Sequence, residues 1–345
     1  MGSKEMGSDP IFLALTGAAG PAQRRAMAKA ITLLESTRAD HRLRADALLN
    51  AVLPLSGRSF RLGISGVPGV GKSTFIEALG LLLIERGHRV AVLAVDPSST
   101  VSGGSILGDK TRMEHLSVHP QAFIRPSPSS GTLGGVAEKT RESMLVCEAA
   151  GYDVVIVETV GVGQSETAVA RMTDMFVLMQ LPNAGDELQA IKKGVMELAD
   201  LVLINKADLD PDAATRAQAQ IQSSLRLFGL HGHPDHAHHD QNIWHPTVLP
   251  LSALKAQGLD TFWATVCRFR DLQTQNGQLS ARRVQQAQAW MWERIEAGLR
   301  QRFHQHPAVQ AALPQALADV TGGRLAASVA ARRLLDLLDA SPKYP

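Results

Sequence analysis

The feature that most constrains this chain is a glycine-rich segment between an apolar run and a helical pattern. Arg61–Ser65 has the length and composition of a buried strand, and Phe75–Glu85 has helical spacing. Between them the chain reads Gly66-Val67-Pro68-Gly69-Val70-Gly71-Lys72-Ser73-Thr74, which fits the G-x-x-x-x-G-K-[ST] pattern of a P-loop. Glycines let backbone N–H groups approach phosphate oxygens, and the following helix directs its positive end at the same anion. We therefore predict a nucleotide-phosphate site in which Lys72 reaches the β and γ phosphates and Ser73 offers its hydroxyl to Mg²⁺.

Short β-rich runs alternate with helical stretches from residue 58 to about residue 275. The runs are apolar almost throughout, which is typical of strands buried on both faces of a parallel sheet. The sequence therefore predicts an α/β fold, a P-loop NTPase with a mostly parallel sheet flanked by helices. The candidate strands are Arg61–Ser65, Arg89–Val95, Ala122–Arg125, Val154–Glu158, Met175–Gln180, Leu201–Asn205 and Thr247–Leu251.

Helical patterns on either side of this region divide the chain into three expected parts. Residues 11–56 form an N-terminal helical extension, with apolar residues at helical spacing in two groups: Ala30, Ile31 and Leu34, then Leu43, Ala47 and Leu48. Residues 57–275 form the P-loop domain, and residues 280–340 form C-terminal helices, which we expect to break at Pro307, Pro314 and Gly322-Gly323.

A second motif concerns the base of the nucleotide. Asn205-Lys206-Ala207-Asp208 follows the apolar run Leu201–Ile204, and ligands of open α/β sheets bind at such strand ends. The carboxylate of Asp208 can accept hydrogen bonds from N1–H and the exocyclic amine of guanine, a pair that adenine lacks. A site that leaves a polar group unpaired rejects the wrong ligand by ~10⁴ or more. The backbone of Ser252-Ala253-Leu254 is a candidate contact for guanine O6, so GTP and GDP are the expected nucleotides.

Acidic residues at or after strand ends are candidate Mg²⁺ ligands, because Mg²⁺ prefers oxygen and keeps several waters. These are Asp96, Asp109 and Glu158, with helix-capping or turn roles as the alternative. Glu158 is also a candidate catalytic residue. The segment Gly161-Val162-Gly163-Gln164 follows, and its glycines suit a loop that orders around a γ-phosphate. Gln164 is a candidate for orienting the attacking water, with a surface role equally open.

Composition excludes several other classes of protein. The chain has 345 residues and a formal net charge of +2, which argues against a binder of nucleic acid that works through a strongly basic surface. Hydrophobic residues make up 45%, as in globular proteins, and no run reaches the ~18 to 20 apolar residues that span a membrane. The two cysteines, Cys147 and Cys267, exclude a disulfide framework. A cytoplasmic protein with no membrane or nucleic-acid partner is expected.

Several long strings in this chain resemble those of the MeaB/ArgK group of P-loop GTPases, which in animals includes the methylmalonic aciduria type A protein. The resemblance covers roughly residues 25 to 275 and is looser in the C-terminal helices. Besides Gly66–Thr74, the matching strings are Asp96–Ser99, Gly103–Met113, Arg125–Pro128, Gly131–Gly135, Glu158–Glu166 and Gly185–Gln189.

This resemblance implies a function that spacing alone does not. Members of the group are GTPase chaperones of adenosylcobalamin-dependent acyl-CoA mutases. They deliver intact cofactor to the mutase and remove damaged cofactor from it. They are homodimers joined through C-terminal helices. By position, the resemblance implies switches at Ser102–Met113, Gly161–Thr167 and Pro182–Lys193. In the third switch, Asp186, Gln189 and Lys192 are candidates for coupling to the mutase.

Two other functions remain open from the residues. A P-loop alone also fits a kinase, and His231–His245, which holds six histidines, fits a GTPase chaperone that inserts nickel or cobalt. The alternative for this loop is a solvated insertion with no metal role.

Overall fold

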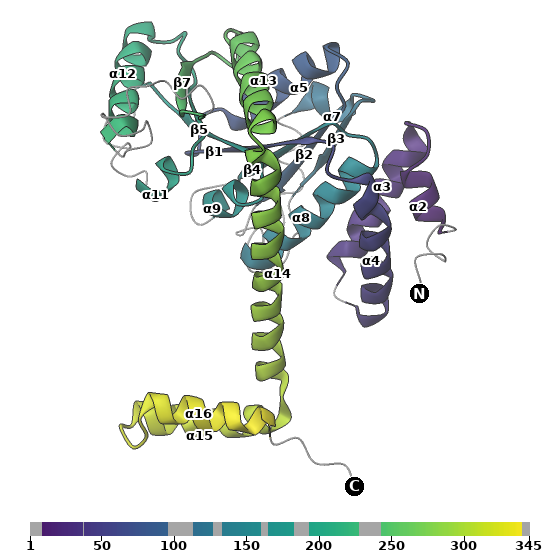
Figure 1. The fold of residues 1–345 in the computed structure, drawn as a ribbon, viewed down its shortest axis with the longest axis vertical. Helices are drawn as coiled ribbons and strands as arrows, with labels where there is room; N and C mark the ends of the chain where they lie inside the picture. Colours follow the sequence, from purple (N-terminus) through teal and green to yellow (C-terminus); the bar gives the residue numbers. More distant parts are fainter. Residues whose placement is uncertain are drawn as a thin grey trace. The chain divides into compact units, whose positions relative to one another are not determined.

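The strands expected from the sequence form one parallel sheet in the computed structural model, which describes residues 9–36, 38–95, 113–126, 133–159, 165–182, 193–227 and 243–339 (Figure 1). The strand order is β3-β2-β4-β1-β5-β6-β7, and every pairing is parallel. The strands are β1 (Phe60–Gly66), β2 (Val90–Val95), β3 (Ala122–Arg125), β4 (Val154–Thr159), β5 (Met175–Gln180), β6 (Leu201–Ile204) and β7 (Thr247–Pro250). The predicted α/β class and all seven strands are confirmed, with end points shifted by one residue at most.

The helices between residues 9 and 275 precede the strands, connect them or, in the case of α13, follow the last of them. They are α2 (Pro10–Leu15), α3 (Pro21–Glu35), α4 (Ala39–Val52), the 3₁₀ helix η1 (Leu53–Leu55), α5 (Lys72–Glu85), α7 (Glu114–Val118), α8 (Leu133–Ala149), α9 (Ser165–Ala170), α11 (Lys193–Met196), α12 (Pro211–Leu227) and α13 (Leu259–Gln275). The chain divides into two compact units, Met1–Ser280 and Ala281–Pro345.

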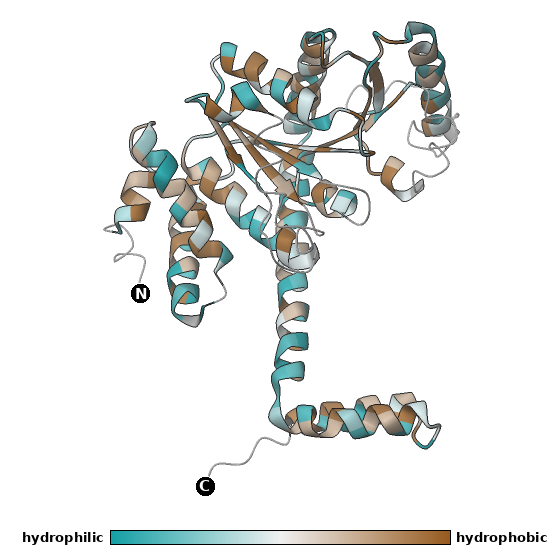
Figure 2. Ribbon diagram, turned by 180° about the vertical axis from the view of Figure 1, so that it is seen from behind, coloured by the Kyte–Doolittle hydropathy of each residue, from teal (hydrophilic) through white to brown (hydrophobic). Residues whose placement is uncertain are grey.

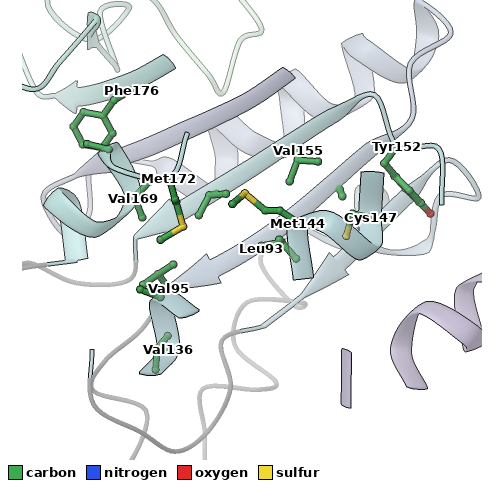
Figure 3. Packing of buried hydrophobic residues seen from close by; sticks show 14 of the residues in the cluster. Leu93, Val95, Val136, Met144, Cys147, Tyr152, Val155, Val169, Met172 and Phe176 are labelled. Atoms are coloured by element: carbon green, nitrogen blue, oxygen red, sulfur yellow. The ribbon is translucent and has the colours of Figure 1, made fainter. Parts of the chain in front are cut away.

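Both faces of the sheet are buried, because successive strand residues point to opposite sides and nearly all are apolar. Figure 2 shows the hydrophobic colouring that runs along the strands. On one face, the cluster includes Leu93, Val155 and Phe176 with Met144 and Cys147 of α8 (Figure 3). On the other face, Ile64, Ile156 and Val177 pack with Phe75 of α5 and Phe262 of α13. Each fully buried side chain of this size contributes ~1.5–3 kcal/mol.

A buried amide in α3 links the N-terminal helices to the rest of the domain, in addition to their apolar packing. Nε2 of Gln23 in α3 donates to the carbonyls of Leu15, Gly17 and Ala150, at 2.9, 3.2 and 3.0 Å. Its Oε1 accepts from Arg89, whose guanidinium lies 4.3 Å from the ring centroid of Tyr152. The helices α2, α3 and α4 confirm the predicted helical character of this segment. Leu43 is an exception to their apolar pattern, because 73% of it is exposed.

The C-terminal helices are α14 (Gln278–Gln305), α15 (Pro307–Thr321) and α16 (Ala327–Asp339), and α15 and α16 lie side by side (Figure 1). Breaks occur at Pro307 and at Gly322-Gly323 as predicted, but the expected break at Pro314 is wrong, because this residue lies inside α15. Pro314 has no N–H group to donate to the carbonyl of Gln310, one turn earlier in the helix. This carbonyl can bind water instead, because Gln310 is exposed. Among the described helices, none combines the length and apolar composition that crossing a bilayer requires.

Candidate nucleotide-binding site

The glycine-rich segment joins β1 directly to α5, which begins at Lys72, three residues earlier than its periodicity suggested. Gly71 has a φ of 94°, a left-handed conformation that a side chain would strain. A Cβ on Gly71 would lie 2.6 Å from Nδ2 of Asn205, and one on Gly66 would lie 2.5 Å from the carbonyl oxygen of Met179. Both glycines are therefore required by close packing, which keeps the loop between two strand ends.

Lys72 is placed at the first turn of α5, at the mouth of this loop. Its Nζ donates to the carbonyl oxygen of Gly66 at 2.6 Å and to that of Val67 at 3.3 Å. Ser73 is half-buried beside it, Val70 is buried, and Pro68, Gly69 and Thr74 are exposed. An ammonium group, a hydroxyl and the first N–H groups of a helix thus meet in one place, which is the chemistry that binds a polyphosphate.

Asn205 joins the phosphate loop to the segment predicted to contact the base. Its side chain is buried, and Nδ2 donates to the carbonyl oxygen of Val70 at 2.7 Å. Its Oδ1 accepts from the backbone N–H of Ala253 at 3.0 Å. The side-chain nitrogen and the side-chain oxygen of Asn205 each form a hydrogen bond with a backbone group. Asn205 therefore holds the two loops at a fixed separation. The next residue, Lys206, has a φ of 61°, so the backbone turns sharply after this link.

Asp208 lies on the other side of this turn with a carboxylate that is held ready to accept hydrogen bonds. The hydroxyl of Ser252 bonds it and holds the pKa of the carboxyl below its ordinary 3.8, and Lys255 adds to this effect. Nζ of Lys255 lies 3.2 Å from Oδ2 of Asp208. Asp208 is therefore an ionised acceptor at neutral pH, the form that a pair of N–H donors on a base would bind.

The loop that carries Ser252 is closed tightly on itself. Ser252 and Gln257 exchange two backbone hydrogen bonds of 3.0 Å, and Ala256 between them has a φ of 53°. Ser252 and Ala253 are buried, whereas 83% of Leu254 is exposed. The closed loop fixes the N–H of Ala253 against Asn205 and leaves Leu254 at the rim of the site.

Glu158 is buried near the end of β4, 3% exposed, and it pairs with Ile64 of β1 and Ala94 of β2. Strand alternation places its side chain on the face covered by α5, together with Ile156. Thr159 points to the opposite face, where its Oγ1 lies 2.9 Å from Oγ of Ser65. The buried carboxylate of Glu158 and the hydroxyl of Ser73 at the start of α5 thus belong to the same side of the sheet.

The remaining predicted site residues lie outside the described part of the chain. These are Asp96, Asp109, Gln164, Asp186, Gln189 and Lys192, together with most of the histidine-rich loop.

Two side chains near the site were not found from the sequence. Lys255 contacts Asp208 only because the Ser252 loop folds back, and no periodicity indicates this. Gln180 ends β5 between the phosphate loop and Asn205, and its backbone oxygen accepts from the N–H of Asn205 at 2.9 Å. A single polar residue at the end of the apolar run Met175–Gln180 was the available signal for it.

The comparisons with known proteins agree with this geometry. GTPase ArgK of Escherichia coli strain K12 is 50% identical over 275 residues, which cover 79% of this chain and 80% of that protein. The methylmalonic aciduria type A homolog, mitochondrial, of Mus musculus is 46% identical over 324 residues, covering 91% of this chain and 76% of that protein. A crystal structure titled LAO/AO transport system kinase matches with a TM-score of 0.74 and 37% identity, covering 99% of this chain and 100% of the other.

A family model described as methylmalonyl Co-A mutase-associated GTPase MeaB matches residues 27–308, well over half of the chain. The match takes in the phosphate loop, the Asn205 link and the Ser252 loop, the parts that the structure brings together. The chain therefore belongs to the MeaB family of P-loop GTPases.

Proposed function

We propose that this GTPase is a chaperone of an acyl-CoA mutase. It couples GTP binding and hydrolysis to the delivery of adenosylcobalamin to the mutase and to the protection of that mutase. The observation that carries the proposal is the Asn205 link, which ties the phosphate loop to the Ser252 loop, the segment proposed to contact guanine, in a chain of a mutase-associated family. The family description and the name of the mouse relative support the mutase as the partner.

Mg²⁺ fits the donors at the phosphate loop, because Ser73 and Glu158 offer a hydroxyl and a buried carboxylate on the same face of the sheet. Asp96 and Asp109 are proposed as further ligands, directly or through water. When bound, Mg²⁺ neutralises charge on the β and γ phosphates. In this chain, Lys72 and the loop amides position the phosphates, and Gln164 is proposed to orient the attacking water.

We further propose that hydrolysis by the isolated protein is slow. Phosphoryl transfer needs charge stabilisation, and the motifs supply Lys72 but no obvious arginine finger. Binding of the mutase would order the switches and raise the rate, with Asp186, Gln189 and Lys192 as the coupling residues. Single-turnover hydrolysis with and without the mutase tests this, and equal rates would refute it.

The mutase proposal itself is tested by a pull-down with purified adenosylcobalamin-dependent mutases, repeated with GDP and with a non-hydrolysable GTP analogue. Nucleotide-dependent capture of one mutase supports the proposal. A stable phosphorylated acceptor after incubation with labelled GTP would favour the kinase. Nanomolar nickel or cobalt binding that is lost on deletion of residues 231–239, without any mutase capture, would favour the metal-insertion chaperone.

Base selection gives a quantitative expectation. Asp208→Asn should weaken GTP binding about tenfold to a hundredfold, because a hydrogen bond to a charged group is worth about 1.5–3 kcal/mol. Calorimetry with GTP and ATP measures the change. Asp212→Asn is the matched control, since Asp212 is exposed in α12 and loses the same charge. Wild-type protein that held ATP as tightly as GTP would contradict guanine selection.

A homodimer formed through the C-terminal helices is also proposed. No described side chain of α14 is buried, and its apolar residues Met291, Ile295 and Leu299 are 52%, 40% and 58% exposed. With Trp290 they line one shallow hollow, the kind of surface that a partner covers.

This surface predicts the effect of charge on assembly. Ile295→Glu combined with Leu299→Glu should raise the dimer dissociation constant about a hundredfold or more, because each lost contact occurs twice in a symmetric dimer. Light scattering across a concentration series measures it. Val118→Glu, at a 75% exposed residue of α7, is the control and should not change the mass. A monomeric wild-type protein at micromolar concentration would reject the dimer.

A further inference from the structure

Gln180 is a fully buried amide with an unusual environment. Its exposed fraction is 0%, and neither Nε2 nor Oε1 has a hydrogen-bonding partner among the described residues. Gln23, which is 2% exposed, donates to three carbonyls and accepts from Arg89. A buried polar group without partners destabilises a fold, because it has lost water and gained nothing in exchange. Such a group therefore calls for an explanation, and one is another arrangement of the protein in which it is paired.

The position of Gln180 connects it with the nucleotide-binding edge of the sheet. The preceding residue, Met179, packs so closely on Gly66 that any side chain there would collide with it. The backbone oxygen of Gln180 accepts from the N–H of Asn205, which links the phosphate loop to the Ser252 loop. Gln180 therefore lies between the two segments that we propose to contact the nucleotide.

Other buried polar side chains share the face of the sheet to which Gln180 points. Gln180 alternates with Phe176 and Leu178, which face α8 and α9. On that face Ser65 and Thr159 bond each other, and both are 0% exposed.

Ser165 belongs to the same group. A Cβ on Gly63 would lie 2.9 Å from Val169 of α9. Because α9 follows the carboxyl end of β4 and Val169 lies beside Gly63 inside β1, Ser165, one helical turn earlier, lies nearer to the carboxyl ends of the strands. Ser165 is 1% exposed. We call Ser65, Thr159, Ser165 and Gln180 the polar layer.

The polar layer borders two of the segments implied to be switches. Thr159 precedes the implied switch Gly161–Thr167, Ser165 lies within it, and Gln180 precedes the segment that begins at Pro182. Hydroxyl groups can donate or accept, so this layer can take more than one hydrogen-bonding arrangement. An element with two arrangements responds to a ligand only through differential affinity for them.

We propose that Gln180 is a positioning residue that distinguishes GTP from GDP. In the GTP-bound form its amide bonds a hydroxyl of the polar layer, and in the GDP-bound form it remains without that bond. The γ-phosphate thereby stabilises one hydrogen-bonding arrangement of the polar layer. The change in arrangement is passed to the residues that precede and follow Gln180 in the chain. The inference rests on the proposed binding of guanine nucleotides at Lys72 and Asp208.

The experiment compares Gln180→Met with Gln23→Met in the full-length protein. Methionine keeps the length and flexibility of glutamine but forms no comparable hydrogen bonds. Dissociation constants for fluorescent GDP and for a fluorescent non-hydrolysable GTP analogue are measured with Mg²⁺, along with the melting temperature without nucleotide. For Gln180→Met we expect unchanged GDP affinity, about fivefold weaker binding of the analogue, and a melting temperature unchanged or raised by about 2–4 °C.

Gln23→Met should lower the melting temperature and leave the ratio of the two dissociation constants unchanged, because its partners are structural carbonyls. The proposal is overturned if Gln180→Met leaves this ratio unchanged as well. An unchanged ratio with a lowered melting temperature would assign Gln180 to a buried water instead. Failure of the wild-type protein to bind either nucleotide would refute the proposed function, an outcome that is distinct from an unchanged ratio.

Discussion

Replacing Lys72 by alanine is expected to slow GTP hydrolysis about a hundredfold to a thousandfold. Removal of one preorganised donor from a developing negative charge typically has an effect of this size. Nζ of Lys72 lies within 2.6 Å of the Gly66 carbonyl, at the start of the helix where the phosphates would bind. The ammonium group can move from the loop carbonyls to phosphate oxygens with a small change of its flexible side chain.

Phosphate release under single-turnover conditions, with Mg²⁺ and excess protein, measures the rate. Lys29→Ala is the matched control, because Lys29 is exposed on α3 and its loss removes the same charge. Circular dichroism should show that Lys72→Ala stays folded, since the lysine is only half-buried. If both variants cleaved GTP at the wild-type rate, the phosphate loop would not be the catalytic site.

The second large effect concerns stability. Glu148→Ala is expected to lower the free energy of unfolding by about 3–5 kcal/mol, because it leaves the partner of a buried ion pair without compensation. Glu148 of α8 is 0% exposed at its side chain, and Arg61 of β1 is 14% exposed. Arg61 donates to the carboxylate at 2.7 and 3.0 Å, Ser59 at 2.5 Å and the N–H of Gly57 at 2.6 Å. One carboxylate thus joins α8 to the start of the central strand.

Urea unfolding followed by circular dichroism measures this loss. Asp40→Ala is the control, because it breaks an ion pair with Arg38 in which both side chains are largely exposed. Exposed pairs contribute about 0–1 kcal/mol, so the control should be close to wild type. A Glu148→Ala variant as stable as the control would show that the buried pair contributes nothing.

The same carboxylate predicts how stability depends on pH. Burial raises the pKa of Glu148, but the bonds from Arg61, Ser59 and Gly57 outweigh burial and hold it below the ordinary 4.5. A carboxyl with a lowered pKa in the folded state contributes stability above its unfolded pKa and loses it as pH falls through the folded value. Wild-type protein should therefore lose stability below about pH 4.5 more steeply than Glu148→Gln. Parallel stability curves for the two proteins would contradict this.

The local sequence was sufficient for the elements and the phosphate loop. The central strands were predictable because a buried parallel strand needs apolar side chains on both faces, and this requirement is visible in a short stretch of sequence. Gly66 to Thr74 was predictable because phosphate binding needs a contiguous set of backbone N–H groups. The predicted break at Pro314 was wrong because the energetic cost of a proline in a helix depends on whether the carbonyl that loses its donor can bind water.

What the sequence by itself determined was therefore the fold class and the position of the phosphate loop, since both depend on neighbours in the chain. Only the tertiary structure decided that Asn205 ties Val70 to Ala253, that Lys255 holds Asp208 and that Arg61 is paired with Glu148. These contacts join residues that meet only through strand order and loop closure. Their energies depend on burial and on sub-ångström geometry, and no local pattern records either quantity.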